Sequence, residues 1–149
     1  MTVKELGHIV LYVKDLEVSR HFYGEVLKWP QIDTGNGMPV AVFSSGRTHH
    51  ELLLIEVGPA AAPVPRGHHL GMYHFGLKVG ETDDELRAVL ESLTANNVKI
   101  VGASDHTVTH SLYIEDPDGN EIELYIDVQP AIWKDNPDAI VAPIKPLRL

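Results

Sequence analysis

Histidine and glutamate side chains are the first candidates for chemistry, because the sequence contains nine histidines and no cysteine. His8 and His74 stand at matching places in the two halves of the chain, each in a strand-like segment, and Glu123 stands in a third such segment. Two imidazoles and one carboxylate leave coordination positions open and suit divalent iron, manganese, nickel or zinc. The alternative is two hydrogen-bonded core histidines and a solvated glutamate.

Alternation along a strand decides which way these side chains point. Residues 110–125, HSLYIEDPDGNEIELY, are typical of a strand, a tight turn and a second strand. In the second strand two aliphatic residues share one face, which suits a core, while Glu123 lies on the other face. The same alternation puts His8 and His74 on the polar faces of their own strands. All three candidate ligands therefore point away from the apolar sides.

The elements that position these residues form an internal repeat, since each half contains a strand, a helix and then further strands. In the first half, strands are predicted over 6–13, 38–46 and 49–57, and a helix over 14–29. In the second half, strands are predicted over 72–79, 98–101, 109–115 and 121–127, and a helix over 82–97. Asp15 is the predicted N-cap of the first helix, and Thr82 and Glu85 form a predicted capping box on the second.

One domain is predicted for the 149 residues, because this length suits one core and is short for two ordinary domains. Within it, a first module covers about residues 1–60 and a second about 70–127. The linker, about 58–69, is rich in Pro, Ala and Gly. The tail, 128–149, contains four prolines and is expected to wrap around the body or to pack at an interface.

Each half is expected to pack the apolar face of its sheet on its helix, which leaves the two polar faces to meet across a cavity. His8, His74 and Glu123 all belong to the polar faces. The predicted core residues are Ile9, Leu11, Phe75, Leu77, Ile122 and Leu124.

Composition narrows the class of protein. A hydrophobic content of 44% and a charged content of 22% are ordinary for a globular protein. A net charge of −9 argues against nucleic acid or an anionic membrane as partner, because both attract clustered Lys and Arg. The absence of cysteine excludes disulfides and a thiolate nucleophile. With neither a leader-like segment nor an apolar run of about 20 residues, we expect a cytoplasmic protein.

The sequence resembles the vicinal oxygen chelate superfamily, which includes glyoxalases, fosfomycin-resistance and bleomycin-resistance proteins, and type I extradiol ring-cleaving dioxygenases. The resemblance extends to about residue 127 and rests on GHIVLYVKDLEVSRHFYGEVLKW, YHFGLKV and DPDGNEIELY. It implies an α+β fold in which two βαβββ modules pair into an open, cup-shaped mixed sheet with the helices outside. It also implies that His8, His74 and Glu123 are the metal ligands.

Two longer segments are similar to one-domain extradiol dioxygenases of the catechol 2,3-dioxygenase type. GRTHHELLLIE implies that His50 is an active-site histidine. SDHTVTHSLYIEDPDGNEIELY implies that His106 is the second active-site histidine and Tyr113 the active-site tyrosine, with His110 as the competitor of His106.

Alternation gives a further expectation for the first of these segments. His50, Leu52 and Leu54 share one face of the predicted strand. We therefore expect all three side chains to line the cup.

The activity implied by the resemblance is Fe(II)-dependent extradiol (meta) cleavage of a catechol by O2, with Mn(II) as the alternative metal. Bidentate binding of a catechol needs the loss of at least one proton. His50 would take up a proton, and His106 and Tyr113 would hydrogen-bond the bound catecholate. Catechol and O2 are therefore the expected partners, and a small symmetric body is expected to form a homo-oligomer.

Two alternatives stay open. A glyoxalase-type isomerase would need a fourth protein ligand, for which Glu51 and Glu56 are available in the first half, and Glu56 shares the alternation face of His50. A metal-free protein that binds small molecules and confers resistance is the other alternative. The intact set of His8, His74 and Glu123 argues against it.

Overall fold

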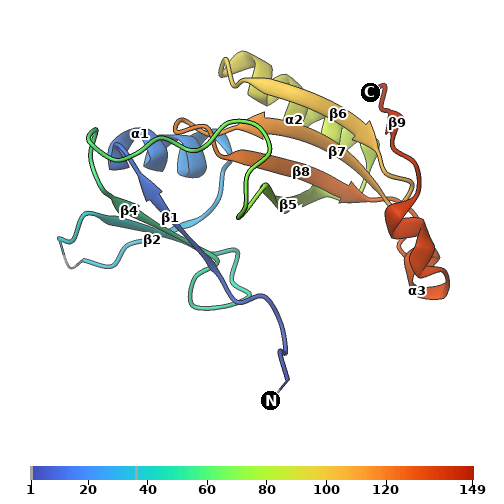
Figure 1. Cartoon of the computed structure of the whole chain (residues 1–149), viewed down its shortest axis with the longest axis horizontal. Helices are drawn as coiled ribbons and strands as arrows, with labels where there is room; N and C mark the ends of the chain where they lie inside the picture. Colours follow the sequence, from blue (N-terminus) through green and yellow to red (C-terminus); the bar gives the residue numbers. More distant parts are fainter. Residues whose placement is uncertain (1, 36) are drawn as a thin grey trace. The chain divides into compact units, whose positions relative to one another are not determined.

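The computed structural model describes residues 2–35 and 37–149, and the chain divides into two compact units, residues 1–64 and 65–149. The division falls inside the segment predicted as a linker. Each unit contains one mixed β-sheet and one main helical segment, as Figure 1 shows. The predicted α+β class is therefore confirmed.

The sheet of the first unit has four strands in the order β1-β4-β3-β2, with β1 parallel to β4 and the other pairs antiparallel. Its elements are β1 (Ile9–Val13), α1 (Leu16–Arg20), η1 (His21–Val26), β2 (Gln31–Ile32), β3 (Val40–Phe43) and β4 (Leu52–Glu56).

Local chemistry explains the start of this unit. The Asp15 carboxylate accepts a hydrogen bond of 3.1 Å from the amide of Val18, which confirms the predicted N-cap of α1. Along β1, Leu11 and Val13 are buried while Tyr12 is 71% exposed, as the alternation predicts.

The helix predicted over 14–29 is not regular. It is α-helical only in α1 and continues in η1 as a π-helical turn, in which the amide of Leu27 donates to the carbonyl of Phe22. In this wider turn the consecutive residues Phe22 and Tyr23 are both buried.

The sheet of the second unit has five strands in the order β5-β8-β7-β6-β9, with β5 parallel to β8. Its elements are β5 (His74–Gly80), α2 (Asp83–Ala95), β6 (Ile100–Asp105), β7 (Thr109–Glu115), β8 (Glu121–Asp127), α3 (Ala131–Asp135), η2 (Pro137–Val141) and β9 (Lys145–Pro146). Its first strand pairs in parallel with the last strand of the repeat, as in the first unit, so the internal repeat is confirmed.

Helix α2 covers one face of the five-stranded sheet (Figure 1). The predicted capping box is present, because the hydroxyl of Thr82 accepts from the amide of Glu85 and the Glu85 carboxylate accepts from the amide of Thr82. Leu86 on the helix is fully buried, and so is Ile122 on the sheet. Glu123 alternates with Ile122 along β8 and therefore points to the face of the sheet away from α2.

The tail packs on the edge of the same sheet. Strand β9 pairs with β6, which places Pro146 opposite Ser104 and Lys145 opposite Asp105. This pairing covers an edge strand, as globular proteins commonly do, and it agrees with the expectation that the tail wraps around the body. In the described residues, no helix is long and apolar enough to cross a bilayer.

Candidate active site

The second unit brings His74 and Glu123 together on the open face of its sheet. The Nε2 atom of His74 lies 3.3 Å from Oε2 of Glu123, and the two side chains are 26% and 17% exposed. In the β5–β8 register, however, the residue opposite Glu123 is Gly76. A side chain at Gly76 would lie 3.3 Å from the Tyr125 ring and 3.7 Å from the Glu123 carboxylate, so glycine leaves the space in which Glu123 leans towards His74.

The other ring nitrogen of His74 faces a second carboxylate. Nδ1 is buried and has no hydrogen-bond partner among the described residues, and Oε1 of Glu121 lies 3.9 Å from it. A metal-ligating histidine commonly points one nitrogen at the metal and the other at a carboxylate that orients the ring. His74 and Glu123 therefore fit two ligands of a divalent cation, with Glu121 as the orienting group.

A buried serine holds the remaining oxygen of Glu123. The hydroxyl of Ser111 donates to Oε1 across 2.6 Å, and Ser111 is fully buried. Ser111 is not among the predicted site residues. The signal was available, since Ser111 and Tyr113 share a face by alternation.

Tyr113 and His106 form a pair beside this carboxylate. Tyr113 lies opposite Glu123 in the β7–β8 register, and its hydroxyl is 2.7 Å from Nε2 of His106. The Tyr113 ring packs edge-on against His74, with the ring centres 5.5 Å apart. Burial and then the charge and hydrogen bonding of Glu123 raise the pKa of Tyr113, so the phenol keeps its proton at neutral pH.

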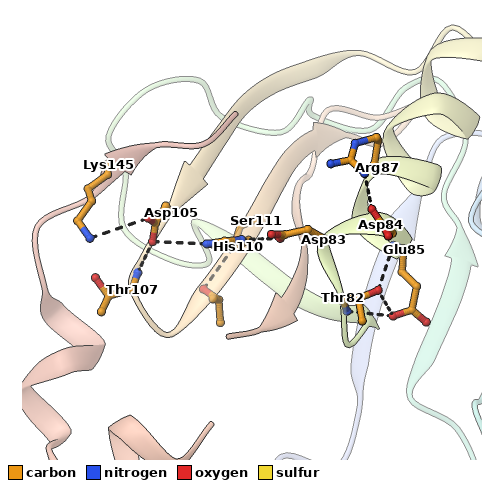
Figure 2. Close-up of polar contacts among 11 residues, drawn as sticks. Thr82, Asp83, Asp84, Glu85, Arg87, Asp105, Thr107, His110, Ser111 and Lys145 are labelled. Atoms are coloured by element: carbon orange, nitrogen blue, oxygen red, sulfur yellow. Dashed lines mark hydrogen bonds and ion pairs between the residues drawn. The ribbon is translucent and has the colours of Figure 1, made fainter. Parts of the chain in front are cut away.

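His110, the competitor of His106, points to the other side of β7. Its Nδ1 is 2.6 Å from Oδ1 of Asp83 on α2, and its Nε2 is 3.8 Å from Asp105. Figure 2 shows the ring held between these two carboxylates, with Lys145 reaching Asp105 from the tail. Only His106 of the two histidines lies against Tyr113.

The first unit contains a separate group of three imidazoles. His8 stands immediately before β1, and its ring centre is 4.3 Å from that of His50. The Nδ1 atoms of His49 and His50 are 2.6 Å apart. Nε2 of His50 is buried without a hydrogen-bond partner in the described parts of the chain, and burial followed by the neighbouring imidazoles lowers the pKa of His50. His50 is therefore neutral at pH 7.

The expectation that Leu52 and Leu54 line a cup with His50 is wrong. Both leucines are fully buried, and they pair in register with Ile9 and Leu11 on the core face of the sheet. Strand β4 begins only at Leu52, so His50 lies in the turn before it.

Both carboxylates considered as a fourth ligand are hydrogen-bonded to other residues of the first unit. Oε2 of Glu56 accepts a 2.8 Å hydrogen bond from the amide of Leu16 at the start of α1. The Glu51 carboxylate accepts from the hydroxyl and the amide of Ser45 and pairs with Arg47 at 3.1 Å. Glu56, which was expected to share a face with His50, is therefore hydrogen-bonded at the start of α1 instead.

The two repeats differ at the position of Glu123. His74 lies opposite Glu121, and Glu123 follows two residues later. If the β1–β4 register is continued by one residue, His8 lies beside Glu51, and Leu53 follows two residues later. Leu53 thus stands in the first repeat where Glu123 stands in the second. Within either unit, no three His, Asp or Glu side chains of the described residues are arranged to hold a metal ion.

A duplicated strand-helix-strand unit with histidine and glutamate on the open sheet faces defines a protein of the vicinal oxygen chelate type. The chain belongs to the Glyoxalase/Bleomycin resistance protein/Dioxygenase superfamily, whose model matches residues 5–124.

Two relatives are named as dioxygenases. The chain is 32% identical over 129 residues to the catechol-2,3-dioxygenase of Bacillus subtilis, an alignment that covers 87% of this chain and 44% of that protein. It is also 32% identical over 123 residues to biphenyl-2,3-diol 1,2-dioxygenase 2 of Rhodococcus globerulus, covering 83% of this chain and 63% of that protein. The chain thus spans less than two thirds of either relative.

Solved structures share the fold. A glyoxalase/dioxygenase from Nostoc punctiforme matches with a TM-score of 0.69 at 21% identity, covering 85% of this chain and 92% of that one. A lactoylglutathione lyase from Agrobacterium tumefaciens matches with a TM-score of 0.61 at 23% identity, covering 85% of this chain and 96% of that one. These likenesses establish the architecture and leave the reaction to the side chains.

Proposed function

We propose that the chain is an Fe(II)-dependent extradiol dioxygenase that cleaves a catechol-type ring with O2. The observation that carries the proposal is the group on one sheet face of the second unit, in which the His74–Glu123 pair lies beside the hydrogen-bonded pair of Tyr113 and His106. Metal-ligand types next to two proton-bearing groups suit a reaction that binds and deprotonates a diol. The two relatives named as dioxygenases support the same reaction.

The proposed ligands are His8, His74 and Glu123, with His8 supplied by the first unit. When bound, Fe(II) would supply open coordination positions for the diol and O2 and relay electrons from the diol to O2, and Mn(II) has the same ligand preferences. Ring opening beside the two oxygens would place both atoms of O2 in a hydroxymuconic semialdehyde type of product. The expected homo-oligomer stays a prediction.

The remaining residues would move and hold protons. Tyr113 keeps its phenolic proton and can donate a hydrogen bond to a catecholate oxygen, while His106, 2.7 Å away, would orient the phenol. His50 is neutral, and no described residue hydrogen-bonds its Nε2 atom, so it can accept a proton released when the diol binds.

The isomerase alternative needs a fourth ligand from the first unit. Leu53 occupies the position that corresponds to Glu123, and Glu51 and Glu56 are engaged by neighbouring backbone and side-chain donors. These contacts favour three protein ligands and hence the dioxygenase. The metal-free binding protein is disfavoured, because a pure binder has no use for an imidazole and a carboxylate facing each other at 3.3 Å.

The test is an oxygen-electrode assay of the full chain, loaded anaerobically with Fe(II) and then mixed with a panel of catechols in air. The proposal predicts oxygen uptake and a yellow ring-fission product with at least one catechol. Absence of uptake across the panel, together with isomerisation of a glutathione hemithioacetal by the Ni(II) or Zn(II) form, would assign the chain to the isomerases instead.

A further inference from the structure

The side chain of Ser111 makes one short contact that the proposed reaction does not use. Its hydroxyl is fully buried and lies 2.6 Å from Oε1 of Glu123, and 3.4 Å from the hydroxyl of Thr109. A hydroxyl–carboxylate distance of about 2.5–2.7 Å is typical of a charge-assisted hydrogen bond, which is stronger than one between neutral groups. Ser111 therefore donates its proton mainly to Glu123.

Because Ser111 and Glu123 lie on neighbouring strands of the sheet, their hydrogen bond fixes the orientation of the carboxylate. In the β7–β8 register Ser111 lies opposite Tyr125, so its bond to Glu123 runs diagonally across the two strands. On the other side, Oε2 of Glu123 faces Nε2 of His74 on β5. One oxygen of the carboxylate is thus held from β7, while the other faces His74 on β5.

We propose that Ser111 is a positioning residue, which keeps Oε1 of Glu123 occupied so that Oε2 alone is offered to a bound divalent cation. The inference rests on the metal site of the proposed function. A carboxylate that offers one oxygen takes one coordination position, and this leaves more positions for a diol and O2 than a carboxylate that binds through both oxygens. Outer-shell partners of this kind typically change metal affinity by about 10–100-fold when they are removed.

The test measures Fe(II) affinity by anaerobic titration calorimetry of the full chain and compares variants that differ in one hydroxyl. Ser111→Ala removes the hydroxyl donor. Ser111→Thr and Ser111→Val introduce side chains of nearly the same shape, of which only threonine keeps the hydroxyl. We expect the Ala and Val variants to bind Fe(II) about 10–100-fold more weakly than wild type, and the Thr variant to bind within threefold of it.

Ser104→Ala is the matched control. Ser104 lies opposite Ser111 in the β6–β7 register, on the same sheet face. It should leave the affinity unchanged, and thermal unfolding of the metal-free variants monitors their folding. If Ala at 111 does not fold, the Thr–Val pair still isolates the hydroxyl.

The outcomes separate the two proposals. Wild-type protein that binds Fe(II), with Val at 111 binding equally well, would overturn the role of Ser111 and leave the proposed function intact. An equal loss with Thr and Val would also overturn it, because the shape of the side chain would then matter and the hydroxyl would not. Wild-type protein without affinity for Fe(II), Mn(II) or Co(II) would overturn both.

Discussion

The two units have the same strand order around their first and last strands, yet they present different side chains on the open faces of their sheets. In the first unit this face includes Val10 and Tyr12, with Leu53 beside them on β4. In the second unit the corresponding strands present His74 and Glu123. The fold therefore fixes equivalent positions, and the residue types at those positions decide which side chains each unit presents.

The supporting contacts differ as well. The second unit has a buried hydroxyl on Glu123 and a tyrosine–histidine pair next to it. In the first unit, the carboxylate beside His8 is that of Glu51, which accepts a hydrogen bond from Ser45 and pairs with Arg47 in a turn. The second unit thus groups an imidazole, a carboxylate and a phenol on one sheet face, whereas the first has its imidazoles before β1 and β4 and an apolar surface on those strands.

Removing the carboxylate that only the second unit presents has the largest expected effect. Glu123→Ala should abolish oxygen uptake and weaken Fe(II) binding by more than about 100-fold, because losing a ligand costs more than losing its outer-shell partner. Glu51→Gln changes the carboxylate beside His8 in the first unit. It is the control and should bind Fe(II) like wild type. Anaerobic calorimetry measures the Fe(II) affinity of both variants. Equal losses of affinity would contradict the different roles assigned to Glu123 and Glu51.

The tyrosine–histidine pair should affect turnover and leave the metal in place. Tyr113→Phe and His106→Gln are expected to lower kcat by about 10²–10⁴-fold, the usual range for a positioned proton donor or acceptor, with one Fe per chain retained. His110→Gln should leave kcat unchanged, since His110 contacts Asp83 on the helix side. An equal loss of kcat in the His110→Gln and His106→Gln variants would contradict the role assigned to His106.

Adding the missing carboxylate to the first unit would make the two units alike. Leu53→Glu should strengthen Zn(II) or Ni(II) binding by about tenfold, or about 1.4 kcal/mol, and lower oxygen uptake, because a fourth ligand fills a position that O2 needs. Leu53→Gln controls for the loss of the apolar side chain. Unchanged metal affinity in the Leu53→Glu variant would mean that the position of Leu53 is not equivalent to that of Glu123.

The smallest expected effect concerns the start of the second unit, where Arg66 pairs with Glu115. Hydrogen bonds first from Lys99 and then from Arg66 lower the pKa of Glu115 below its ordinary value of 4.5, although partial burial opposes them. A lowered pKa stabilises the folded state above pH 4.5, and this stabilisation is lost as the pH falls through the lower folded-state pKa.

Glu115→Gln should therefore reduce the free energy of unfolding by less than about 1 kcal/mol at pH 7, because Lys99 and Arg66 are largely exposed. The difference from wild type should disappear at pH values below the folded-state pKa. Urea unfolding at a series of pH values measures it, and a difference that grows on acidification would contradict the assigned direction.

Elements set by local chemistry could be predicted closely. Strands 109–115 and 121–127 have the predicted bounds, because their alternation is strict and a turn separates them. The Thr82–Glu85 capping box also follows from residues three apart in the sequence. The polar face that carries His74 and Glu123 follows from the same alternation.

Features that depend on distant partners could not be predicted. Glu56 is used by the amide of Leu16, 40 residues earlier in the chain, and no local pattern indicates that bond. The start of β4 at Leu52 depends on the turn that Glu51 holds, so extending strand alternation to His50 assigned its neighbours to the wrong face. The role of Ser111 needed the register of β7 against β8.

The proposed function depends on His8 being a ligand of the same cation as His74 and Glu123. Fe(II) titration of His8→Ala beside His74→Ala tests it most directly, with His21→Ala as a control on the first helical segment. The account predicts that both ligand variants lose affinity by similar factors while the control binds like wild type. If His8→Ala bound Fe(II) as tightly as wild type while His74→Ala lost affinity, the second unit alone would hold the metal and the claim would fail.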